Sequence, residues 1–484
     1  MGTGSVHFSS IDHRDRHERG GARPYASSMV RIDRDVVVVG AGACGLTAAN
    51  RLREAGASVI VLEARDRVGG RLHTDASSGA LLELGGQWVS PDQTALRETL
   101  DELGLPTFER YRDGESVYVG PDGTAHRFTG DIFPASPETQ AEIERLIEVL
   151  DGLTAEIDPD RPWAHPRARE LDGITWRAFL EQLSDDDEAR ANVAMFTAEA
   201  MLTKPSHAFS ALQSLLMAAS AGSFSHLVDA DFILDRRVVG GLQQVPLRLA
   251  EALGDDVRLS SPVRRIEWSD DGVLVTADGD LEVAARRVVL AVPPNLYDRI
   301  DYAPTLPLRR HVLHQHLSLG LVIKIHAVYD EPFWRADGLS GTAFSPYRSV
   351  HEAYDNSNHG DPRGVLVGFA SDARADRLLA LEPEARKAAI LDDLASYYGE
   401  RAKHPTIYVE SDWGSEEWTR GAYAASFDMG GLERFGADVR TPVGPIHWAS
   451  SDLAGAGYQH VDGAIRMGRW VAAEVLQALA PTPA

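Results

Sequence analysis

The stretch from Asp35 to Arg71 constrains the fold most, because it predicts a strand, a tight glycine turn, a helix and a second strand in direct succession. The strand Asp35–Val39 contains an unbroken run of valines, which is typical of a strand buried on both faces of a parallel sheet. A helix is expected from Leu46 to Ala55 and a second strand from Ser58 to Glu63. This order of elements is that of a dinucleotide-binding unit, so the predicted fold class is α/β.

The turn after the first strand carries glycines at the G-x-G-x-x-G spacing. Gly40 permits the tight turn, Gly42 lets backbone approach a pyrophosphate, and Gly45 lets the helix pack on the strand. The N-terminus of the helix would face the same anion. Glu63 ends the second strand, where a carboxylate can accept hydrogen bonds from a ribose 2′-hydroxyl. The spacing alone would fit an ordinary tight turn, but with its flanking elements it favours a dinucleotide with an unphosphorylated ribose.

Directly after this unit comes RVGGR, from Arg67 to Arg71, and with it the chain resembles the flavin-dependent amine oxidase family. In that family such a turn lies against the phosphates of FAD, so the resemblance implies FAD rather than NAD. It also implies a Rossmann-like FAD-binding domain of the p-hydroxybenzoate-hydroxylase and amine-oxidase type, interleaved with an α+β substrate-binding domain. The residues that match the cofactor-contacting positions of the family are Gly40, Ala41, Gly42, Gly45, Glu63, Ala64, Arg65, Gly70, Arg71, Gly86, Gln87, Trp88, Val263, Trp413, Ser451, Asp452, His460, Val461 and Ala464.

The order of patterns along the chain predicts how these domains interleave. Residues 1–30 are rich in His, Arg, Ser and Gly and are expected to form a disordered tail. The FAD-binding domain is expected to consist of residues 31–89, 236–294 and 424–480. The substrate-binding domain is expected to consist of residues 90–235 and 295–423. The first of these two stretches should be mostly helical, because its apolar residues recur at intervals of three and four.

Composition limits the class of protein. At 484 residues the chain is long enough for a two-domain enzyme with a large core. The formal net charge of −24 argues against nucleic acid as a partner and favours cationic ligands, although solubility alone would also account for it. The single cysteine, Cys44, excludes an internal disulfide and a multi-thiolate metal site, so no metal is expected and the cytoplasm is the expected compartment. No stretch approaches the roughly 20 consecutive apolar residues that span a bilayer, so no membrane association is expected.

The resemblance places three residues in catalytic positions. Lys324, in an alternating strand, matches a family lysine that holds a water near the reactive nitrogen of the flavin. The resemblance implies that it activates oxygen or places this water, while a structural salt bridge is the alternative. Tyr423 matches an aromatic residue beside the flavin that steers the amine, and Trp413 matches one on the flavin itself. His460 stands where the family has a second tyrosine, which suggests a general base or hydrogen-bonding group, or else a buried histidine satisfied by backbone.

The residue before Tyr423 decides how the cofactor is attached. Family members that bind FAD covalently carry a cysteine at this position, and this chain has Ala422. Cys44 belongs to the pyrophosphate turn and should lie far from the flavin ring. The FAD is therefore expected to be non-covalent.

Within the family, the chain resembles the oxidases of the diamine putrescine more than those of aromatic monoamines. Segments that carry this resemblance include MLTKPSHAFSALQSLLMAASAGSFSHL and GYQHVDGAIRMG. A diamine reacts through one neutral nitrogen while the other stays an ammonium, and burying that ammonium unpaired costs several kcal/mol. A carboxylate at the far end of the pocket is therefore needed. Glu352 in SVHEAYDN is the first candidate and Asp355 the second, with a solvated surface position as the alternative for either.

The expected reaction is the oxidation of putrescine by O2 and water to 4-aminobutanal, ammonia and hydrogen peroxide. Tyr423 and His460 are expected to contact the substrate together with the distal acid. The partners are then a small amine and O2, and the resemblance leaves a homodimer open. The alternatives are an oxidase of other amines, such as cadaverine, a polyamine or a monoamine, and a flavoprotein without oxidase activity. An amino-acid oxidase is disfavoured, because the site motifs offer no arginine for a substrate carboxylate.

Overall fold

The computed structural model describes residues 30–480 of the chain. The expected tail, residues 1–30, lies outside the described residues except for Val30, which begins the first strand β1 (Val30–Val39). The glycine turn leads into α1 (Ala43–Glu54) and then β2 (Val59–Leu62), so the predicted strand, helix and strand are confirmed with small shifts in their ends. The four consecutive valines at residues 36–39 of β1 are buried, as an internal parallel strand requires, whereas Val30 at its start is exposed.

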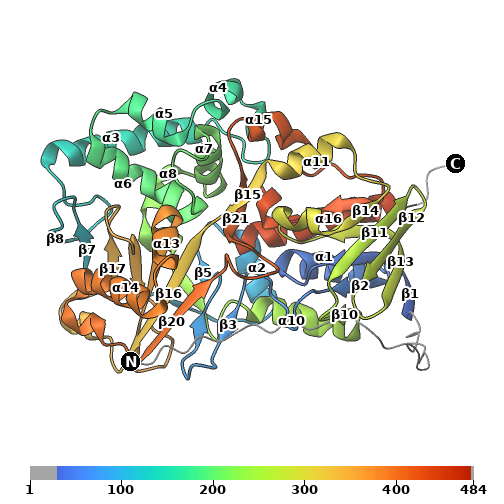
Figure 1. Cartoon of the computed structure of the whole chain (residues 1–484), viewed down its shortest axis with the longest axis horizontal. Helices are drawn as coiled ribbons and strands as arrows, with labels where there is room; N and C mark the ends of the chain where they lie inside the picture. Colours follow the sequence, from blue (N-terminus) through green and yellow to red (C-terminus); the bar gives the residue numbers. More distant parts are fainter. Residues whose placement is uncertain (1–29, 481–484) are drawn as a thin grey trace, which may run out of the picture.

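The first sheet has eight strands in the order β10-β2-β1-β13-β12-β11-β14, with β22 also paired to β13. Strand β1 lies parallel to both β2 and β13. The remaining strands are β10 (Val257–Arg258), β11 (Val263–Ser269), β12 (Gly272–Ala277), β13 (Leu281–Leu290), β14 (Asp301–Ala303) and β22 (Ile446–Trp448). In Figure 1 this sheet lies at the right, together with α1, α10 (Gln244–Leu253) and the closing helix α16 (Val461–Leu479).

The second sheet has seven strands in the order β20-β16-β19-β18-β17-β7-β8 and lies at the left of Figure 1. Its strands are β7 (Glu115–Val119), β8 (Ala125–Phe128), β16 (Val322–Tyr329), β17 (Leu339–Phe344), β18 (Glu352–Asp355), β19 (Gly364–Ser371) and β20 (Ile407–Asp412). Two stretches of chain that are far apart in the sequence thus share one sheet.

A group of helices lies in the upper part of Figure 1, above the second sheet and the centre of the molecule. They are α3 (Pro137–Thr154), α4 (Ala168–Asp172), α5 (Trp176–Leu183), α6 (Asp187–Thr197), α7 (Ala211–Ser220), α8 (Phe224–Val228) and α9 (Ala230–Ile233). The helices outside this group are α2 (Thr94–Glu102), α11 (Leu308–Gln315), α12 (Phe333–Ala336), α13 (Asp372–Leu379), α14 (Pro383–Tyr398) and α15 (Gly431–Phe435).

Three short sheets connect these parts. They pair β3 (Thr74–Asp75) with β4 (Leu82–Glu83), β15 (Leu317–Gly320) with β21 (Ala422–Phe427), and β9 (Arg236–Val238) with both β5 (Trp88–Val89) and β6 (Thr107–Glu109). Strand β21 carries the predicted Tyr423, and β5 carries the predicted Trp88.

The structure differs from the expected arrangement at two places. Strands β7 and β8 form a hairpin inside the stretch that was expected to be mostly helical. The turn between them, PDG at residues 121–123, is a hairpin signal that the helical periodicity on either side obscured. Strand β14 lies in the second stretch predicted for the substrate-binding domain, yet it pairs with β11 of the first sheet. The division into domains otherwise stays a prediction.

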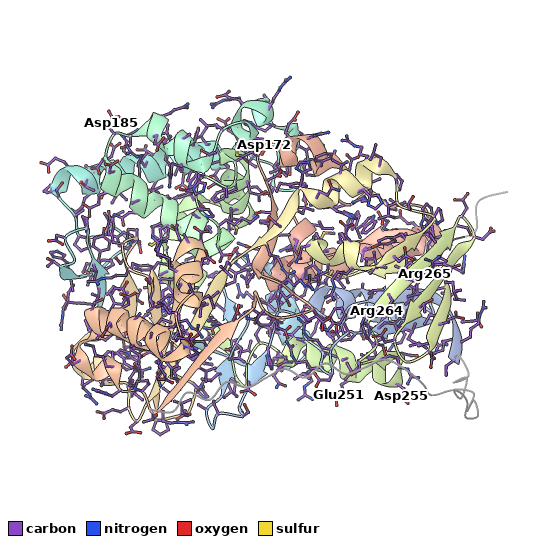
Figure 2. All side chains as sticks on the ribbon, in the orientation of Figure 1. Asp172, Asp185, Glu251, Asp255, Arg264 and Arg265 are labelled. Atoms are coloured by element: carbon purple, nitrogen blue, oxygen red, sulfur yellow. The ribbon has the colours of Figure 1, made fainter. Side chains whose placement is uncertain are left out.

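Figure 2 draws the side chains of the molecule and labels several charged residues. Acidic residues such as Asp185, Glu251 and Asp255 are exposed, in keeping with the net charge of −24. Between residues 30 and 480, none of the helices combines the length and hydrophobicity that crossing a membrane demands.

Candidate active site

A cavity extends from the glycine turn after β1 to the strand β18 of the second sheet. At its first end, the turn has the geometry that a phosphate requires. A Cβ on Gly40, whose φ is +104°, would lie 2.8 Å from the carbonyl oxygen of Ala291, and a Cβ on Gly45 would overlap the carbonyl oxygen of Gly40. A Cβ on Gly42 would meet no atom within 4 Å, because that side of Gly42 faces the cavity. Within the described chain, no side chain caps α1, so its N-terminal N–H groups are left for a ligand.

Glu63 lies beside this turn in the cavity wall, with Ala64 and Arg65. Its carboxylate accepts the backbone N–H of Ala41 at 2.7 Å and that of Arg65 at 2.9 Å. The Arg65 guanidinium donates in turn to Glu416 and to the hydroxyl of Thr419. Backbone therefore holds the Glu63 carboxylate in place at the edge of the cavity, where it can accept from a hydroxyl group.

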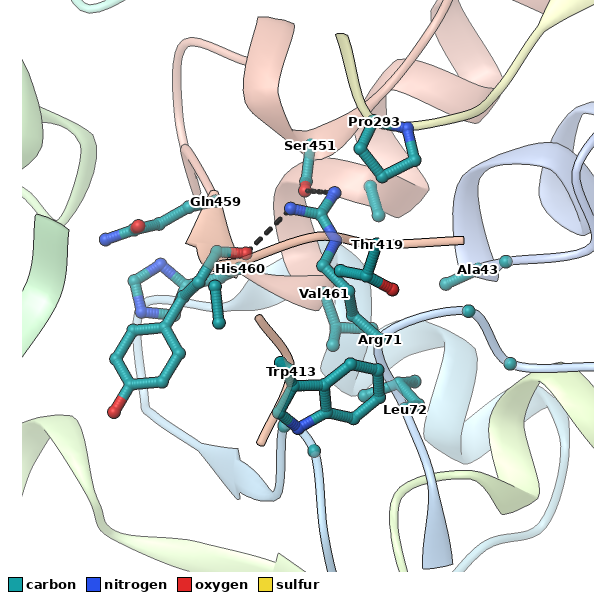
Figure 3. Close-up of a pocket in the computed structure, with 18 of the residues that line it drawn as sticks. Ala43, Arg71, Leu72, Pro293, Trp413, Thr419, Ser451, Gln459, His460 and Val461 are labelled. Atoms are coloured by element: carbon teal, nitrogen blue, oxygen red, sulfur yellow. Dashed lines mark hydrogen bonds between the residues drawn. The ribbon is translucent and has the colours of Figure 1, made fainter. Parts of the chain in front are cut away.

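Arg71 occupies the middle of the cavity wall (Figure 3). It donates to the backbone carbonyl of Tyr423 at 2.7 Å and to the hydroxyl of Ser451 at 3.1 Å. It also forms an ion pair with Asp452 at 2.6 Å. The side chain of Asp452 is fully buried and does not line the cavity, because its oxygens are taken up by Arg71 and by the N–H of Ala425. Asp452 therefore acts through Arg71 rather than at the cavity surface.

Aromatic residues and one histidine surround the next part of the cavity. Trp413 is buried and donates its indole N–H to the carbonyl of Leu84 at 2.8 Å. The ring of Tyr423 lies edge-on to that of Phe369, at a centroid distance of 6.2 Å. Burial, and then the nearby Glu352 carboxylate, raise the pKa of Tyr423 well above its usual value, so this phenol stays protonated at neutral pH.

His460 lies at the start of α16 and lines the same part of the cavity (Figure 3). Its Nδ1 is 2.9 Å from the backbone carbonyl of Tyr458. A carbonyl oxygen only accepts, so Nδ1 carries the proton and Nε2 of the neutral ring is an acceptor. Backbone thus binds one ring nitrogen of His460, and no side chain or backbone group within residues 30–480 forms a hydrogen bond with the other, so its role as a general base or hydrogen-bonding group stays a prediction.

Lys324 is on β16, 4% exposed, and reaches the cavity between the rings of Trp88 and Phe369. Its ammonium donates to the carbonyls of Glu83 and Gly85 at 2.7 Å each and to Oε1 of Gln87 at 2.6 Å. Burial is the main reason that its pKa is lowered to about 7. In this arrangement all three N–H donors of the charged form are used, and no salt bridge partner is in contact with it among the described residues.

Glu352 and Tyr354 form the far end of the cavity. Glu352 is 6% exposed, and its Oε2 accepts the hydroxyl hydrogen of Tyr354 at 2.9 Å. On the other side, Nε2 of His351 lies 3.7 Å from Oε1. The second candidate, Asp355, does not line the cavity. Side chains alternate along a strand, so Glu352 and Tyr354 share the cavity face of β18 and Asp355 points to the opposite face.

On that opposite face Asp355 is already paired. Its carboxylate accepts from the indole N–H of Trp334 at 2.9 Å and from the guanidinium of Arg335 at 2.8 Å. A carboxylate that is buried and paired in this way has no capacity for a further cation from the cavity. The structure therefore brings Glu352, and not Asp355, to the cavity.

A family model described as flavin containing amine oxidoreductase matches residues 43–476. The chain belongs to this family. Putrescine oxidase of Kocuria rosea is 61% identical over 463 residues, which are 93% of this chain and 97% of that protein. A solved structure of putrescine oxidase bound to putrescine is 62% identical, with a TM-score of 0.92, and the match covers 93% of this chain and 100% of the other. Cyclohexylamine oxidase from Brevibacterium oxydans is 31% identical, with a TM-score of 0.87 over 93% of this chain and 100% of the other.

Membership of the flavin-containing amine oxidoreductases confirms the predicted fold class and FAD as the cofactor. The residues of the cavity fit this group. The open side of Gly42 and the uncapped start of α1 would hold the pyrophosphate, and Glu63 would hold the ribose. The indole N–H of Trp88 is buried without a hydrogen-bond partner in the described chain and lies in the same wall.

Nineteen of the positions predicted from sequence line this cavity, and four do not. Those that line it are Gly40, Gly42, Glu63, Ala64, Arg65, Gly70, Arg71, Gly86, Gln87, Trp88, Val263, Lys324, Glu352, Trp413, Tyr423, Ser451, His460, Val461 and Ala464. Those that do not are Ala41, Gly45, Asp355 and Asp452. Ala41 and Gly45 shape the turn from behind it, and Ala41 anchors Glu63.

Sequence reasoning missed several residues of the cavity wall. Tyr354 could have been found, because it lies two residues from Glu352 and must share its face of the strand. Phe344 and Phe369 lie on neighbouring strands and become neighbours of Glu352 only through the register of the sheet. Within residues 30–480 there is no group of three or more histidine, cysteine or acidic residues arranged to hold a metal ion.

Proposed function

We propose that this protein oxidises the primary diamine putrescine with O2 and water to 4-aminobutanal, ammonia and hydrogen peroxide. The observation that carries the proposal is the buried carboxylate of Glu352 at the end of an aromatic-lined cavity whose other end has the features of an FAD site. The relative at 61% identity, a putrescine oxidase, and the solved structure of putrescine oxidase bound to putrescine support it.

Bound FAD would supply the redox chemistry, as the acceptor of a hydride from the α-carbon of the amine and the source of two electrons for O2. The amine must be neutral to lose this hydride, and the resulting iminium is hydrolysed by water to the aldehyde and ammonia. Each turnover thus uses one diamine, one O2 and one water. The free amine of 4-aminobutanal is expected to cyclise onto its own aldehyde.

The far end of the cavity recognises the second nitrogen. Tyr354 donates one hydrogen bond to Oε2 of Glu352, which leaves lone pairs on both oxygens for an ammonium. The aromatic rings nearby, Phe344 and Phe369, exclude water around the carbon chain. Because the ammonium is desolvated there, the carboxylate is required to compensate its charge.

Tyr423 and His460 orient the nitrogen that reacts. The protonated phenol of Tyr423 offers a ring face and a hydrogen-bond donor, and it is not a base at neutral pH. Nε2 of His460 is the acceptor at this end, so we assign it the N–H of the neutral amine. Holding the α-carbon in one orientation toward the cofactor is the main contribution of these two residues.

Lys324 contributes charge next to the site of oxygen reduction. Because its three donors are used by protein acceptors, we assign it an electrostatic role toward O2 rather than the placement of a water. A positive charge favours the transfer of electrons to O2, and the pKa of about 7 means that Lys324 carries this charge mainly below neutral pH.

The partners in this proposal are the amine and O2, with no nucleic acid. We place the enzyme in the cytoplasm, on the basis of its single cysteine and the absence of a spanning helix between residues 30 and 480. The homodimer stays a prediction, and sedimentation of the holoenzyme would test it.

Anaerobic bleaching of the flavin by a panel of amines tests the proposed function. We expect putrescine to bleach the flavin absorbance ~10-fold or more faster than butylamine at equal low concentration, because only putrescine presents a second charge to Glu352. A benzylic amine and an amino acid serve as controls for the other substrate classes. Bleaching by none of the amines would leave a flavoprotein without oxidase activity, and a preference for butylamine would contradict the diamine assignment.

A further inference from the structure

Arg110 is a buried guanidinium outside the cavity that none of the steps above uses. It follows β6 directly, and it is 3% exposed. All five of its N–H groups are donated, to the carbonyls of Leu234, Tyr111 and Ala230, the hydroxyl of Thr342 and the carboxylate of Asp231, at 3.0–3.4 Å. Because all of its donors form hydrogen bonds, Arg110 rigidly connects several elements.

Two of these acceptors belong to a wall of the cavity. Ala230 and Ile233 of α9 line the cavity, and so does Leu234, the residue after it. A helix of one turn is too short to be stable without external support, and Arg110 holds the carbonyls at both of its ends.

The same guanidinium also contacts a second part of the cavity wall. Its carbon Cζ lies 5.6 Å from the centroid of the Tyr354 ring, and the hydroxyl of Tyr354 donates to Glu352. Arg110 therefore connects α9 to the residue that orients the distal carboxylate. Among residues 30–480 its positive charge forms an ion pair with Asp231 alone, and the side chain of Asp231 is 60% exposed, so water weakens the compensation of that charge.

We propose that Arg110 sets the length and charge of the amine that the cavity accepts. This rests on the proposed function. As a positioning residue, it holds α9 against Tyr354 and so limits the space beyond Glu352. Its charge also repels a further ammonium group that extends past Glu352. Both effects favour a short diamine over longer diamines and over a triamine.

The test compares kcat/KM of the holoenzyme for putrescine, 1,6-diaminohexane, the triamine spermidine and butylamine. For Arg110→Met we expect the ratios of 1,6-diaminohexane and of spermidine to putrescine to rise by about 10-fold or more, mostly through KM. For Arg110→Lys, which keeps the charge but loses the fork of donors, 1,6-diaminohexane should gain while spermidine gains less. A purely structural role would lower kcat/KM for all four substrates by the same factor, and that result would overturn the proposal.

Two further variants keep the proposal testable if the Arg110 variants fold poorly. Asp231→Asn removes an exposed carboxylate that compensates the positive charge of Arg110. The ratio of kcat/KM for spermidine to that for butylamine should therefore fall by about 3-fold or more. Arg236→Met is the matched control, because Arg236 donates to Thr107 and Glu109 and contacts neither α9 nor Tyr354, and its ratios should stay within about 2-fold of the wild type. Unchanged ratios for Asp231→Asn would contradict the charge effect.

If the wild type oxidises no diamine, the proposed function itself fails, whereas putrescine oxidation with unchanged ratios in the variants refutes only the role of Arg110.

Discussion

Glu352 and Lys324 are ionisable side chains buried in the wall of one cavity, and their hydrogen-bond partners differ in kind. The Lys324 ammonium has three protein acceptors within 2.7 Å, so its donors are used. The Glu352 carboxylate receives one hydrogen from Tyr354 and keeps free lone pairs. Lys324 therefore supplies an ammonium group held in one position, and Glu352 supplies a place for a cation to bind.

Replacing Glu352 by Gln tests this distinction. The substitution removes the charge and nearly preserves the shape, so the distal ammonium of putrescine is left unpaired. Breaking a buried charge pair costs about 3–5 kcal/mol, so kcat/KM for putrescine should fall by about two to three orders of magnitude. Butylamine has no distal charge, and its kcat/KM should be unchanged or higher. The ratio of the two substrates separates this effect from general damage to the fold.

Asp355→Asn is the matched control on the other face of β18. It should lower stability, because Trp334 and Arg335 lose their charged acceptor, while the ratio of putrescine to butylamine stays as in the wild type. If Glu352→Gln leaves the ratio unchanged and Asp355→Asn alters it, the two carboxylates have been assigned the wrong way round.

The pH dependence of reoxidation tests Lys324. Its pKa of about 7 means that the ammonium is charged below pH 7 and neutral above it. If this charge favours electron transfer to O2, the rate constant for reoxidation of the reduced enzyme should fall as the pH rises through about 7. Lys324→Met should be slow at every pH and show no such step, with a smaller effect on anaerobic reduction by amine. Stopped-flow traces in which only the reduction step is slowed would refute the assignment.

At the level of elements, the turn between β1 and α1 carries two glycines with opposite surroundings. Gly45 faces the carbonyl of Gly40, and Gly42 faces the cavity. The same added methyl group should therefore damage the fold at one position and ligand binding at the other.

We expect Gly45→Ala to destabilise the protein by about 1–3 kcal/mol, because the helix must move away from the turn. Gly42→Ala should melt within about 2 °C of the wild type without FAD, because its φ of −79° suits alanine and the Cβ meets no atom within 4 Å. Its affinity for FAD should fall by about 10-fold or more, since the methyl group occupies the phosphate space. Titration of the apoprotein with FAD and thermal melts measure both quantities. Equal FAD affinity in Gly42→Ala and the wild type would exclude this turn as the phosphate site.

For the molecule as a whole, the cavity is assembled from both large sheets, so cofactor retention depends on the folded chain rather than on a bond. Ala422 lies in the cavity wall where a tethering thiol would be needed, and Cys44 lies in the glycine turn. Burial also raises the pKa of the Cys44 thiol, which keeps it in the unreactive protonated form.

Unfolding should therefore release the cofactor. After heat or acid treatment and centrifugation, we expect at least nine tenths of the yellow colour in the supernatant as free FAD, in about one equivalent per chain. Flavin that stays with the precipitate after a wash in denaturant would show a covalent link.

Local patterns in the sequence were sufficient for the dinucleotide unit. The run of valines, the spaced glycines and Glu63 predicted β1, α1 and β2 to within a few residues, because the interactions that form these elements lie close together in the chain. The resemblance to flavin-dependent amine oxidases placed Lys324, Tyr423 and His460 at one cavity for a different reason, since it carries the result of folding in related chains.

Contacts between distant segments decided the rest. The alternation of side chains along β18 turned Glu352 toward the cavity and Asp355 toward Trp334 and Arg335. From the sequence alone, either residue could have been the distal acid. Arg71 pairs with Asp452, and Lys324 donates to three acceptors on another segment. In both cases the partners are more than 200 residues apart in the sequence. Such pairs have no local signature, because a buried charge selects its partner by proximity in space after the sheets have formed.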